Sequence, residues 1–345
     1  RWIDKRGYKK DNKGYYLNFF LKLFKLLPPE LSHSFSLKSL NILYKLKILK
    51  FFTKRPSNDE SFDFIGLRFK NRLGTAAGLD KNGDYIDSLG ELGFGFLEVG
   101  TITPKAQKGN SKPRVFRNFK ENSIINRLGF NNKGVDHLVK NLKNRSYEGI
   151  IGVNIGANKQ SEGPERINDY LICLEKVYKH SDYITINISS PNTPNLRELH
   201  NKDELKNLIE AIDSKVIELD IATPIFLKIS PDESDQVIDT VIEILDSSQI
   251  SGIIATNTTI DKSNIINKEF RSIDGGLSGA PLMGKATDKL SYIYTRSNHI
   301  PLIGVGGVTS KKDYEMKLQA GAQLVQIYTG FIIKGPKIVN EILSN

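Results

Sequence analysis

A cluster of short polar side chains follows a predicted buried strand near the middle of the chain. The alternating pattern of residues 183–186 leads into the sequence Asn187-Ile188-Ser189-Ser190-Pro191-Asn192-Thr193. Apolar packing does not account for so many amides and hydroxyls at the end of a buried strand. Amide side chains offer paired hydrogen-bond donors and acceptors, and a serine in such a place can move a proton. The loop therefore predicts a small-molecule site that includes proton transfer.

Strand-like runs recur after residue 60, and most are separated by helical patterns such as 203–219 and 235–245. The runs span residues 73–77, 96–100, 150–155, 183–188, 225–229, 252–256, 302–305 and 324–328. A short hairpin around Gly66 precedes the first of them. Eight strands alternating with helices predict the α/β class and a parallel (β/α)8 TIM barrel. A doubly wound open sheet is the structural alternative.

The carboxyl ends of these runs are rich in polar residues and glycine. In a parallel barrel all of these ends meet on one rim, where chemistry gathers. A single Asn at a strand end is more often a turn former, but here the pattern is repeated around the rim. Glycines after the last two strands let backbone N–H groups approach a phosphate, and Lys228 would point a cation at a flavin ring. The residues at the ends include Ala77, Gly78, Lys81, Asn82, Thr101, Asn154, Asn187, Ser190, Asn192, Lys228, Thr256, Asn257, Thr258, Gly304, Gly306, Gly307, Tyr328, Thr329 and Gly330.

Charge is concentrated in the first 55 residues. They hold 14 Lys and Arg against three acids, whereas the remaining 290 residues hold 35 Lys and Arg against 36 acids. A basic segment of this kind fits an acidic partner or surface. The 345 residues contain no run of 18 apolar residues and no secretory signal pattern. The one cysteine, Cys173, excludes an internal disulfide and lies in a helical pattern typical of a core position. The histidines are scattered, and no metal site is predicted.

Two amphipathic helical patterns occupy the basic segment. Residues 15–27 carry Asn18, Lys22 and Lys25 on one narrow polar stripe, and Pro28-Pro29 ends the pattern. A second pattern covers roughly residues 36–52. Two consecutive basic amphipathic helices favour an interfacial membrane anchor, and a helical hairpin packed on the main domain is the alternative. The predicted division is a basic lead at 1–14, a two-helix membrane and quinone-access module at 15–55, and a barrel at 56–345.

Several stretches together make the chain resemble the quinone-dependent (class 2) dihydroorotate dehydrogenases. They are AAGLDKNG (76–83), EVGTITPKAQKGNSKPRVFR (98–117), INRLGFNN (125–132), GVNIGANK (152–159), INISSPNTPNLR (186–197), ATNTT (255–259), GGLSGAPL (275–282), GVGGV (304–308) and LVQIYTGFIIKGP (324–336). They cover essentially the whole predicted barrel. The serine at Ser190 distinguishes the chain from the class 1 enzymes, which the resemblance implies would carry cysteine there.

The resemblance implies oxidation of (S)-dihydroorotate to orotate in de novo pyrimidine (UMP) biosynthesis. One non-covalently bound FMN would take the hydride, and a membrane quinone, ubiquinone or menaquinone, would reoxidise it. We therefore expect a peripheral protein at an anionic membrane surface, on the cytoplasmic side of the bacterial inner membrane or, alternatively, on the mitochondrial inner membrane. We expect a monomer and no nucleic-acid partner.

Site residues carry over by position from the resemblance. Ser190 corresponds to the catalytic base, which would take the C5 proton while hydride leaves C6, with a relay through Thr193 and a water as a hypothesis. The residues implied for FMN are Ala77, Gly78, Leu79, Asp80, Lys81, Thr101, Asn154, Asn187, Lys228, Thr256, Gly279, Gly307, Tyr328 and Thr329. Those implied for the pyrimidine are Lys81, Asn126, Arg127, Leu128, Gly129, Phe130, Asn187, Asn192, Asn257 and Thr258. Those implied for the quinone are His33, Arg117 and Tyr328.

The sequence leaves two alternative functions open and departs from the family pattern at one position. An RNA-modifying FMN barrel of the dihydrouridine synthase type would use the positive charge to bind phosphates, although the basic residues lie on the helical patterns and the barrel is nearly neutral. A non-catalytic membrane scaffold is the other alternative. Asn195 stands where the family usually has glycine, and Asn is the next residue best tolerated in a left-handed conformation; we expect altered loop mobility rather than lost chemistry.

Overall fold

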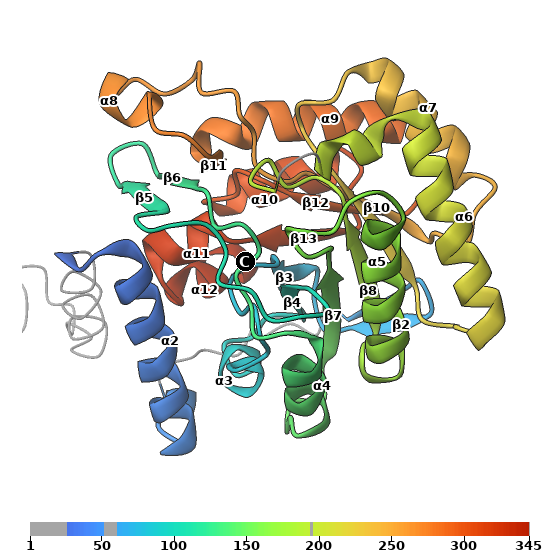
Figure 1. Cartoon of the computed structure of the whole chain (residues 1–345). Coiled ribbons are helices and arrows are strands. Elements are labelled where there is room, and N and C mark those ends of the chain that lie inside the picture. The colour runs from blue at the N-terminus through green and yellow to red at the C-terminus, as the bar shows by residue number, and fades with distance from the viewer. Residues whose placement is uncertain (1–25, 52–60, 194–195, 345) are drawn as a thin grey trace, which may run out of the picture.

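A closed barrel of eight parallel strands forms the centre of the molecule (Figure 1). The computed structural model describes residues 26–51, 61–193 and 196–344. The barrel strands are β3 (Leu73–Thr75), β4 (Phe96–Ile102), β7 (Ile150–Ile155), β8 (Tyr183–Asn187), β9 (Ile225–Ile229), β10 (Gly252–Ala255), β12 (Leu302–Val305) and β13 (Leu324–Ile327). They follow one another around the barrel in chain order, and β13 pairs with β3 to close it. The predicted TIM barrel is confirmed, and the open-sheet alternative is wrong.

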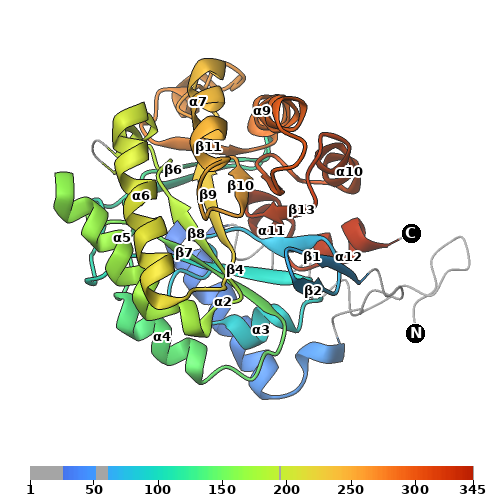
Figure 2. The same ribbon diagram turned by 90° about the vertical axis from the view of Figure 1, so that its right-hand side faces the viewer.

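Helices surround the barrel, as the two views in Figures 1 and 2 show. Apolar residues recur on one side of each long helix, so that side is buried against the strands; α6, for example, buries Leu205, Leu208 and Ile212. The predicted patterns at 203–219 and 235–245 correspond to α6 and α7, and Cys173 is buried in α5, as expected. The helices are α3 (Ile86–Gly90), α4 (Val135–Lys143), α5 (Gly163–Val177), α6 (Lys202–Leu219), α7 (Asp235–Leu245), α8 (Lys268–Arg271), α9 (Met283–Arg296), α10 (Lys311–Gln319), α11 (Thr329–Lys334) and α12 (Lys337–Leu343), with 3-10 turns η1 (Leu49–Phe51), η2 (Tyr178–His180), η3 (Leu196–His200) and η4 (Ala280–Leu282).

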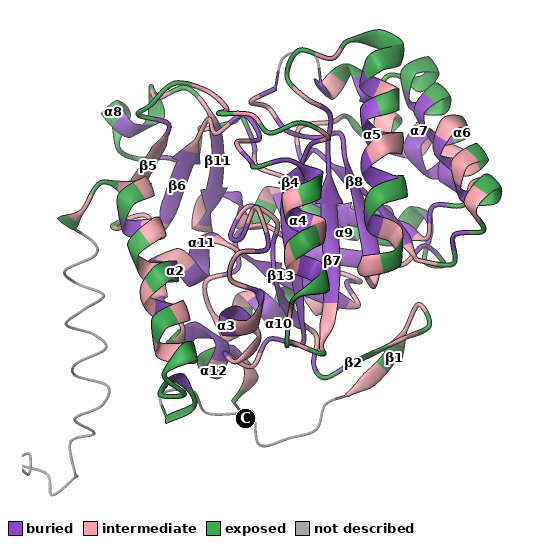
Figure 3. Ribbon diagram, turned by 60° about the horizontal axis from the view of Figure 1, so that its bottom comes forward, coloured by how far each residue is buried: buried purple, intermediate pink, exposed green. Residues whose placement is uncertain are grey.

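Aromatic side chains fill the amino-terminal half of the barrel. The ring of Tyr183 packs edge to face on two others. Its centroid lies 6.3 Å from that of Phe96 and 5.7 Å from that of Phe226. The predicted hairpin, β1 (Phe62–Phe64) paired with β2 (Leu67–Phe69), lies at this end (Figure 3). The Phe69 ring packs edge to face on that of Phe96, with ring centroids 5.6 Å apart. This end of the barrel is thus packed with side chains, whereas the cavity described below lies at the carboxyl ends of the strands.

A second, three-stranded antiparallel sheet lies beside the carboxyl ends of the barrel strands and was not predicted. It consists of β5 (Val115–Asn118), β6 (Ser123–Asn126) and β11 (Gly276–Gly279), in the order β11-β6-β5. Strand β11, with the sequence GLSG, has no alternating apolar pattern to identify it. The sheet brings together segments about 150 residues apart and places Asn126 beside Gly276.

One N-terminal helix, α2 (Pro29–Lys45), lies along the side of the barrel next to α3 and β5. It begins seven residues before the predicted start at 36 and ends at Lys45. Leu49 belongs to the separate 3-10 turn η1. The predicted bounds of 36–52 are therefore wrong. Proline fits the first helical turn, where its missing N–H has no partner to lose. The predicted helix at 15–27 and the basic lead at 1–14 lie almost entirely outside the described residues.

The two faces of α2 differ in exposure, as the colours of Figure 3 show. Leu37 and Leu40 are buried against the barrel domain, whereas Leu31, Phe35 and Ile42 are exposed. The apolar stripe that the sequence offered to a membrane is thus partly used for packing, and a second apolar stripe faces outward. Within the described ranges, none of the helices combines the length and apolar composition that crossing a bilayer requires.

Candidate functional site

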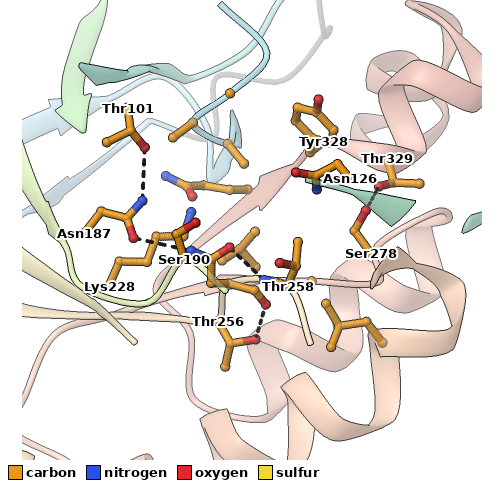
Figure 4. A pocket seen from close by; sticks show the side chains of 18 of the residues that line it. Thr101, Asn126, Asn187, Ser190, Lys228, Thr256, Thr258, Ser278, Tyr328 and Thr329 are labelled. Atoms are coloured by element: carbon orange, nitrogen blue, oxygen red, sulfur yellow. Dashed lines mark hydrogen bonds between the residues drawn. The ribbon is translucent and has the colours of Figure 1, made fainter. Parts of the chain in front are cut away.

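A cavity opens at the carboxyl ends of the barrel strands and encloses about 960 Å³ of space, including the part open to solvent. Figure 4 shows the side chains that point into it. Its walls come from the loops after the barrel strands and from the small antiparallel sheet. The lining residues are Ala76, Ala77, Gly78, Lys81, Thr101, Asn126, Leu128, Gly129, Phe130, Asn187, Ser190, Asn192, Lys228, Thr256, Asn257, Thr258, Ser278, Gly279, Leu282, Val305, Gly306, Gly307, Val308, Gln326, Ile327, Tyr328 and Thr329.

A set of amides and hydroxyls fixes the deep end of the cavity. Asn187 Nδ2 donates to Thr101 Oγ1 at 3.0 Å and to Asn154 Oδ1 at 3.1 Å. Its Oδ1 accepts from the side chains of Ser189 at 3.1 Å and Asn257 at 3.3 Å. The Asn187 amide is therefore held in one orientation by partners on β4, on β7 and on the loops after β8 and β10. A side chain fixed in this way presents a fixed polar surface to a ligand.

Glu98 lies below this layer and connects the barrel strands. Its carboxylate accepts from Asn154 Nδ2 at 2.8 Å, Tyr183 OH at 2.9 Å and Gln326 Nε2 at 2.5 Å. Gln326 also lines the cavity, and its Oε1 is buried with no hydrogen-bond partner among the described residues. A buried acceptor without a partner is costly. This oxygen is consequently suited to accept a hydrogen bond from a bound molecule.

Ser190 lies on the loop after β8, beside the amides of Asn126 and Asn192. The backbone N–H of Asn192 donates to Ser190 Oγ at 3.3 Å, and Asn192 Nδ2 donates to Asn126 Oδ1 at 3.3 Å. Thr193 Oγ1, close by in the sequence, is buried and has no hydrogen-bond partner within the described parts of the chain. The predicted loop thus supplies the Ser190 hydroxyl and the Asn192 amide to the cavity, where they lie beside the Asn126 amide of β6.

Backbone atoms form a different part of the wall at the loops after β11 and β12. A Cβ at Gly307, where φ is +88°, would lie 2.3 Å from Met283 Cα. A Cβ at Gly279, where φ is +95°, would lie 2.1 Å from the Asn122 carbonyl oxygen. Only glycine fits both positions. Thr329 Oγ1 donates to Ser278 Oγ at 2.8 Å in the same region, so hydroxyls and bare backbone lie together, as an anion site requires.

Two lysines bring positive charge to the cavity. Burial and then the neighbouring Arg114 lower the pKa of Lys81 to about 8, while Glu30 and Asp80 act in the opposite direction. Burial also lowers the pKa of Lys228, and the charge of Glu98 opposes that shift. Both ammonium groups are desolvated, and a desolvated cation gains more from an anionic ligand than an exposed one does.

The three residues predicted for a quinone lie around the first turn of α2. Arg117 donates to Ser32 Oγ at 3.0 Å and to the Leu27 carbonyl at 2.5 Å. Burial, followed by the charge of Lys81, lowers the pKa of His33 to about 4, so the imidazole is neutral at pH 7. Burial and Glu30 raise the pKa of Tyr328 to about 12. Tyr328 lines the cavity, whereas His33 and Arg117 lie beside it on the α2 side.

Several predicted site residues do not line the cavity. Asp80 instead accepts the backbone N–H groups of Asp84 and Tyr85 at 3.0 and 2.7 Å, and burial raises its pKa to about 6. Leu79 is buried in the hydrophobic core, and Asn154 supports Asn187 and Thr101 from below. Arg127 turns away to the Pro113 carbonyl at 3.0 Å.

Other lining residues were not predicted as ligand contacts. They are Ala76, Ser278, Leu282, Val305, Gly306, Val308, Gln326 and Ile327. Gly306 stood in the glycine-rich run after β12, and Ser278 in the GLSG run of the resemblance. Gln326 and the apolar residues also fall within stretches of the resemblance, but the pattern does not show that they line the cavity, because their position depends on which side of the chain turns inward.

Comparisons with known proteins agree with this architecture. A family model described as dihydroorotate dehydrogenase matches residues 61–345. Proteins named dihydroorotate dehydrogenase (quinone) are similar to the chain: that of Saccharophagus degradans is 47% identical, covering 92% of this chain and 95% of the relative. That of Vibrio cholerae is 49% identical over 81% of this chain and 85% of the relative.

A solved structure, of the Eimeria tenella DHODH in complex with ferulenol, superimposes with a TM-score of 0.82 at 33% identity, covering 91% of this chain and 89% of that chain. The matching family model spans the whole barrel and its site, and the sequence relatives extend into the N-terminal segment. The chain belongs to the dihydroorotate dehydrogenase family, in its quinone-dependent class.

Proposed function

We propose that the chain oxidises dihydroorotate to orotate in pyrimidine biosynthesis, using FMN and a membrane quinone. The observation that carries this proposal is the convergence of Ser190 with the amides of Asn126, Asn187, Asn192 and Asn257 on one cavity. A dihydropyrimidine edge alternates C=O and N–H groups, and each amide offers both complementary partners. The family membership favours this substrate over the RNA of the alternative hypothesis.

The pyrimidine is proposed to lie between the Ser190 loop and the loop of Leu128, Gly129 and Phe130. The amides of Asn126 and Asn192 already contact each other at 3.3 Å, so one ligand can reach both. The carboxylate of the substrate suits the ammonium of Lys81, which lines the same cavity. Asn257 and Thr258, on the loop after β10, also line the cavity and complete the set. Arg127, whose side chain turns to the Pro113 carbonyl, does not line the cavity and is left out of this subsite.

Ser190 is proposed as the group that takes the C5 proton. A serine hydroxyl is a weak base, so its oxygen needs hydrogen-bond donors as it loses its own proton. The Asn192 N–H, which donates to Ser190 Oγ, is one such donor. Thr193 Oγ1, which lacks a partner among the described residues, is suited to hold a water that carries the proton away.

FMN fits the remainder of the cavity by three observations. Gly279 and Gly307 leave room for backbone contact with a phosphate, next to the hydroxyls of Ser278 and Thr329. Lys228 supplies a desolvated cation at the barrel centre, and Gln326 Oε1 supplies an acceptor without a partner in the described chain. When bound, the flavin accepts the hydride that leaves C6 and passes the electrons to a quinone. The other predicted contacts, Ala77, Gly78, Lys81, Thr101, Asn187, Thr256 and Tyr328, also line the cavity.

The quinone and the membrane are proposed to lie on the α2 side. His33, Arg117 and Tyr328 surround the start of α2, and the outward face of this helix carries Leu31 and Phe35. An exposed apolar stripe interrupted by lysines is typical of a helix that lies in a membrane interface. We propose residues 15–55 as the docking module and the cytoplasmic face of a bacterial inner membrane as its location.

Anaerobic mixing of the purified flavoprotein with dihydroorotate tests the function. We expect the visible flavin absorbance to bleach and to return on addition of a ubiquinone analogue but not of fumarate or NAD. Ser190→Ala should bind orotate, which shows that the site is folded, and should slow bleaching by about 100-fold or more. A variant that bleaches at the wild-type rate would remove Ser190 from the mechanism, and wild-type flavin that stays oxidised would contradict the substrate.

A further inference from the structure

A continuous series of hydrogen bonds leads from Ser190 to the helix α2. The N–H of Asn192 donates to Ser190 Oγ, and the carbonyl of Asn192 accepts from Asn110 Nδ2 at 3.2 Å. The carbonyl of Asn110 accepts from Arg114 Nη1 at 3.0 Å. Residue 110 lies on the loop between β4 and β5, so this loop joins the Ser190 loop to the strand that packs on α2.

Arg114 ends the series in an ion pair with Glu30, in the first turn of α2. Nε and Nη2 of Arg114 lie 3.0 and 2.9 Å from Glu30 Oε1. The side chain of Arg114 is 7% exposed and that of Glu30 is 26% exposed. A nearly buried guanidinium depends on its carboxylate, because an uncompensated buried charge is strongly destabilising. The position of Arg114, and of the two carbonyls of Lys108 and Asn110 that it binds, is therefore linked to the docking of α2.

The same asparagine also holds the opposite wall of the pyrimidine subsite. Asn110 Nδ2 donates to the Arg127 carbonyl at 3.0 Å, and its backbone N–H donates to the Leu128 carbonyl at 3.1 Å. Its side chain packs so closely on Gly129 that a Cβ there would lie 2.8 Å away. Asn110 thus fixes the distance between the Ser190 loop and the 127–129 loop, which form two walls of one cavity.

We propose that Glu30 is a positioning residue for the pyrimidine subsite, acting through Arg114 and Asn110 on the loop that carries Ser190 and Asn192. The proposal rests on the proposed function for the location of that subsite. Its consequence is that docking of α2, the helix on the quinone side, sets the affinity for the pyrimidine on the other side of the flavin site. An arrangement of this kind makes the two half-reactions sensitive to each other without shared ligand contacts.

Charge acts in the same direction as geometry. Glu30 lies close enough to Lys81 to raise its pKa, against the effects of burial and of Arg114. Withdrawal of Glu30 from this group leaves Arg114 as the nearer influence and disfavours the ammonium form of Lys81. A less cationic Lys81 binds an anionic pyrimidine less tightly. Both effects weaken pyrimidine binding when the Glu30 contact is lost.

The test measures orotate affinity in the FMN-loaded enzyme by the change in flavin absorbance on titration. We expect Glu30→Gln, which keeps the shape and removes the charge, to weaken orotate binding by about three- to tenfold, within the usual range for coupled contacts. Ser32→Ala is the matched control, because it removes the bond from Arg117 to the same helix turn and leaves Arg114 intact. The control should bind orotate within about twofold of wild type.

The alternative is that Glu30 only fastens α2 to the barrel and has no effect on the pyrimidine subsite. In that case Glu30→Gln raises the KM for the quinone and leaves orotate affinity at the control value, which overturns the proposal. Equal losses of orotate affinity in Glu30→Gln and Ser32→Ala also overturn it, because they reflect general loosening of α2. Wild-type enzyme that binds no orotate contradicts the proposed pyrimidine site itself and is distinguishable from both.

A double-mutant cycle tests whether Glu30 acts on the subsite through Asn110. Asn110→Ala removes the bonds to Asn192 and Arg127 without touching α2. If Glu30 acts through Asn110, the double variant Glu30→Gln with Asn110→Ala should lose less orotate affinity than the product of the two single losses. Multiplicative losses show independent action and overturn the route.

Discussion

Arg197 and Asp232 are joined by a hydrogen bond of 2.9 Å between Nη1 and Oδ2, and this pair links the turn η3 to the loop after β9. The other guanidinium nitrogens of Arg197 donate to the carbonyls of Ser189 at 3.3 Å and Thr258 at 3.1 Å. Asp232 also accepts from Lys285 at 2.7 Å. Although burial raises the pKa of Asp232, the hydrogen bonds from Lys285 and Thr259 hold it below its usual value.

Arg197→Lys should slow the reduction of the flavin by dihydroorotate by about tenfold, because one ammonium cannot reach three acceptors on the loops after β8, β9 and β10. The expected change lies in the rate of bleaching in a stopped-flow experiment, with flavin content unchanged. Arg296→Lys is the matched control, since Arg296 pairs with Asp239 on the surface, away from the cavity. If flavin reduction in Arg197→Lys is as fast as in this control, the loops keep their positions without the three hydrogen bonds of the guanidinium group.

Gly307→Ala should reduce the amount of flavin that purifies with the protein by about tenfold or more, since the added Cβ meets Met283 and the backbone conformation favours glycine. The ratio of flavin to protein absorbance measures the effect. Gly284→Ala, in the exposed first turn of α9, has open space around its Cβ and should keep the full flavin content. Full flavin content in Gly307→Ala would exclude this loop as the phosphate site.

Lys317 on α10 predicts a pH-dependent stability. Its side chain is fully buried, its Nζ has no hydrogen-bond partner among the described residues, and burial lowers its pKa from 10.5 to about 7. Between these two pH values the unfolded chain binds the proton and the folded chain does not, so the free energy of unfolding rises with pH. Below pH 7 both states are protonated, and the contribution of this group is flat.

Lys317→Met should raise the free energy of unfolding near pH 7 by on the order of 2 kcal/mol, because an apolar chain of similar length replaces an unpaired amine. It should also make the stability less dependent on pH between about 7 and 10. Urea unfolding at pH 6, 7, 8 and 9 measures both. Lys312→Met, on the exposed side of the same helix, should change the stability by less than about 0.5 kcal/mol. A destabilised Lys317→Met would mean that the amine has a role that methionine cannot fill.

Phe35 on the outward face of α2 predicts binding to a membrane. Its side chain is 48% exposed, and Leu31 and Ile42 lie on the same face. Phe35→Ser should lower binding to vesicles containing anionic phospholipid by about tenfold, the effect of one lost aromatic contact with the apolar layer. Ile217→Ser removes an exposed apolar residue from α6, on the far side of the barrel in Figure 1, and should leave vesicle binding unchanged. Equal binding of both variants would place the membrane contact elsewhere.

The barrel and the main part of its site were predictable because the signals are local. Eight apolar runs identify the strands, and the polar residues that follow each run fall on one rim once the strands are parallel. Ser190, Asn187, Asn257 and Lys228 line the cavity for this reason. The resemblance then assigned roles to these positions. The predicted departure at Asn195 lies outside the described residues and stays a prediction.

The bounds of α2 and the small antiparallel sheet were missed because local patterns do not identify them. Leu46 and Leu49 continue the apolar spacing of the helix, but the helix ends at Lys45 and the chain turns at Lys47, where φ is +57°. Strand β11 has the sequence GLSG, and only its pairing with β6 makes it a strand. Pairing with a distant segment, and not the local pattern, therefore makes β11 a strand.

The sequence by itself determined which residues could do chemistry, since side-chain type and position relative to a strand end are properties of short segments. The tertiary structure alone decided which of them act together. Glu98 meets Gln326 across 228 residues, Arg114 meets Glu30 across 84, and Arg127 turns away from the subsite where its neighbours lie. Such contacts depend on how separate segments pack in three dimensions, and no pattern within one segment specifies the partner that another segment brings to it.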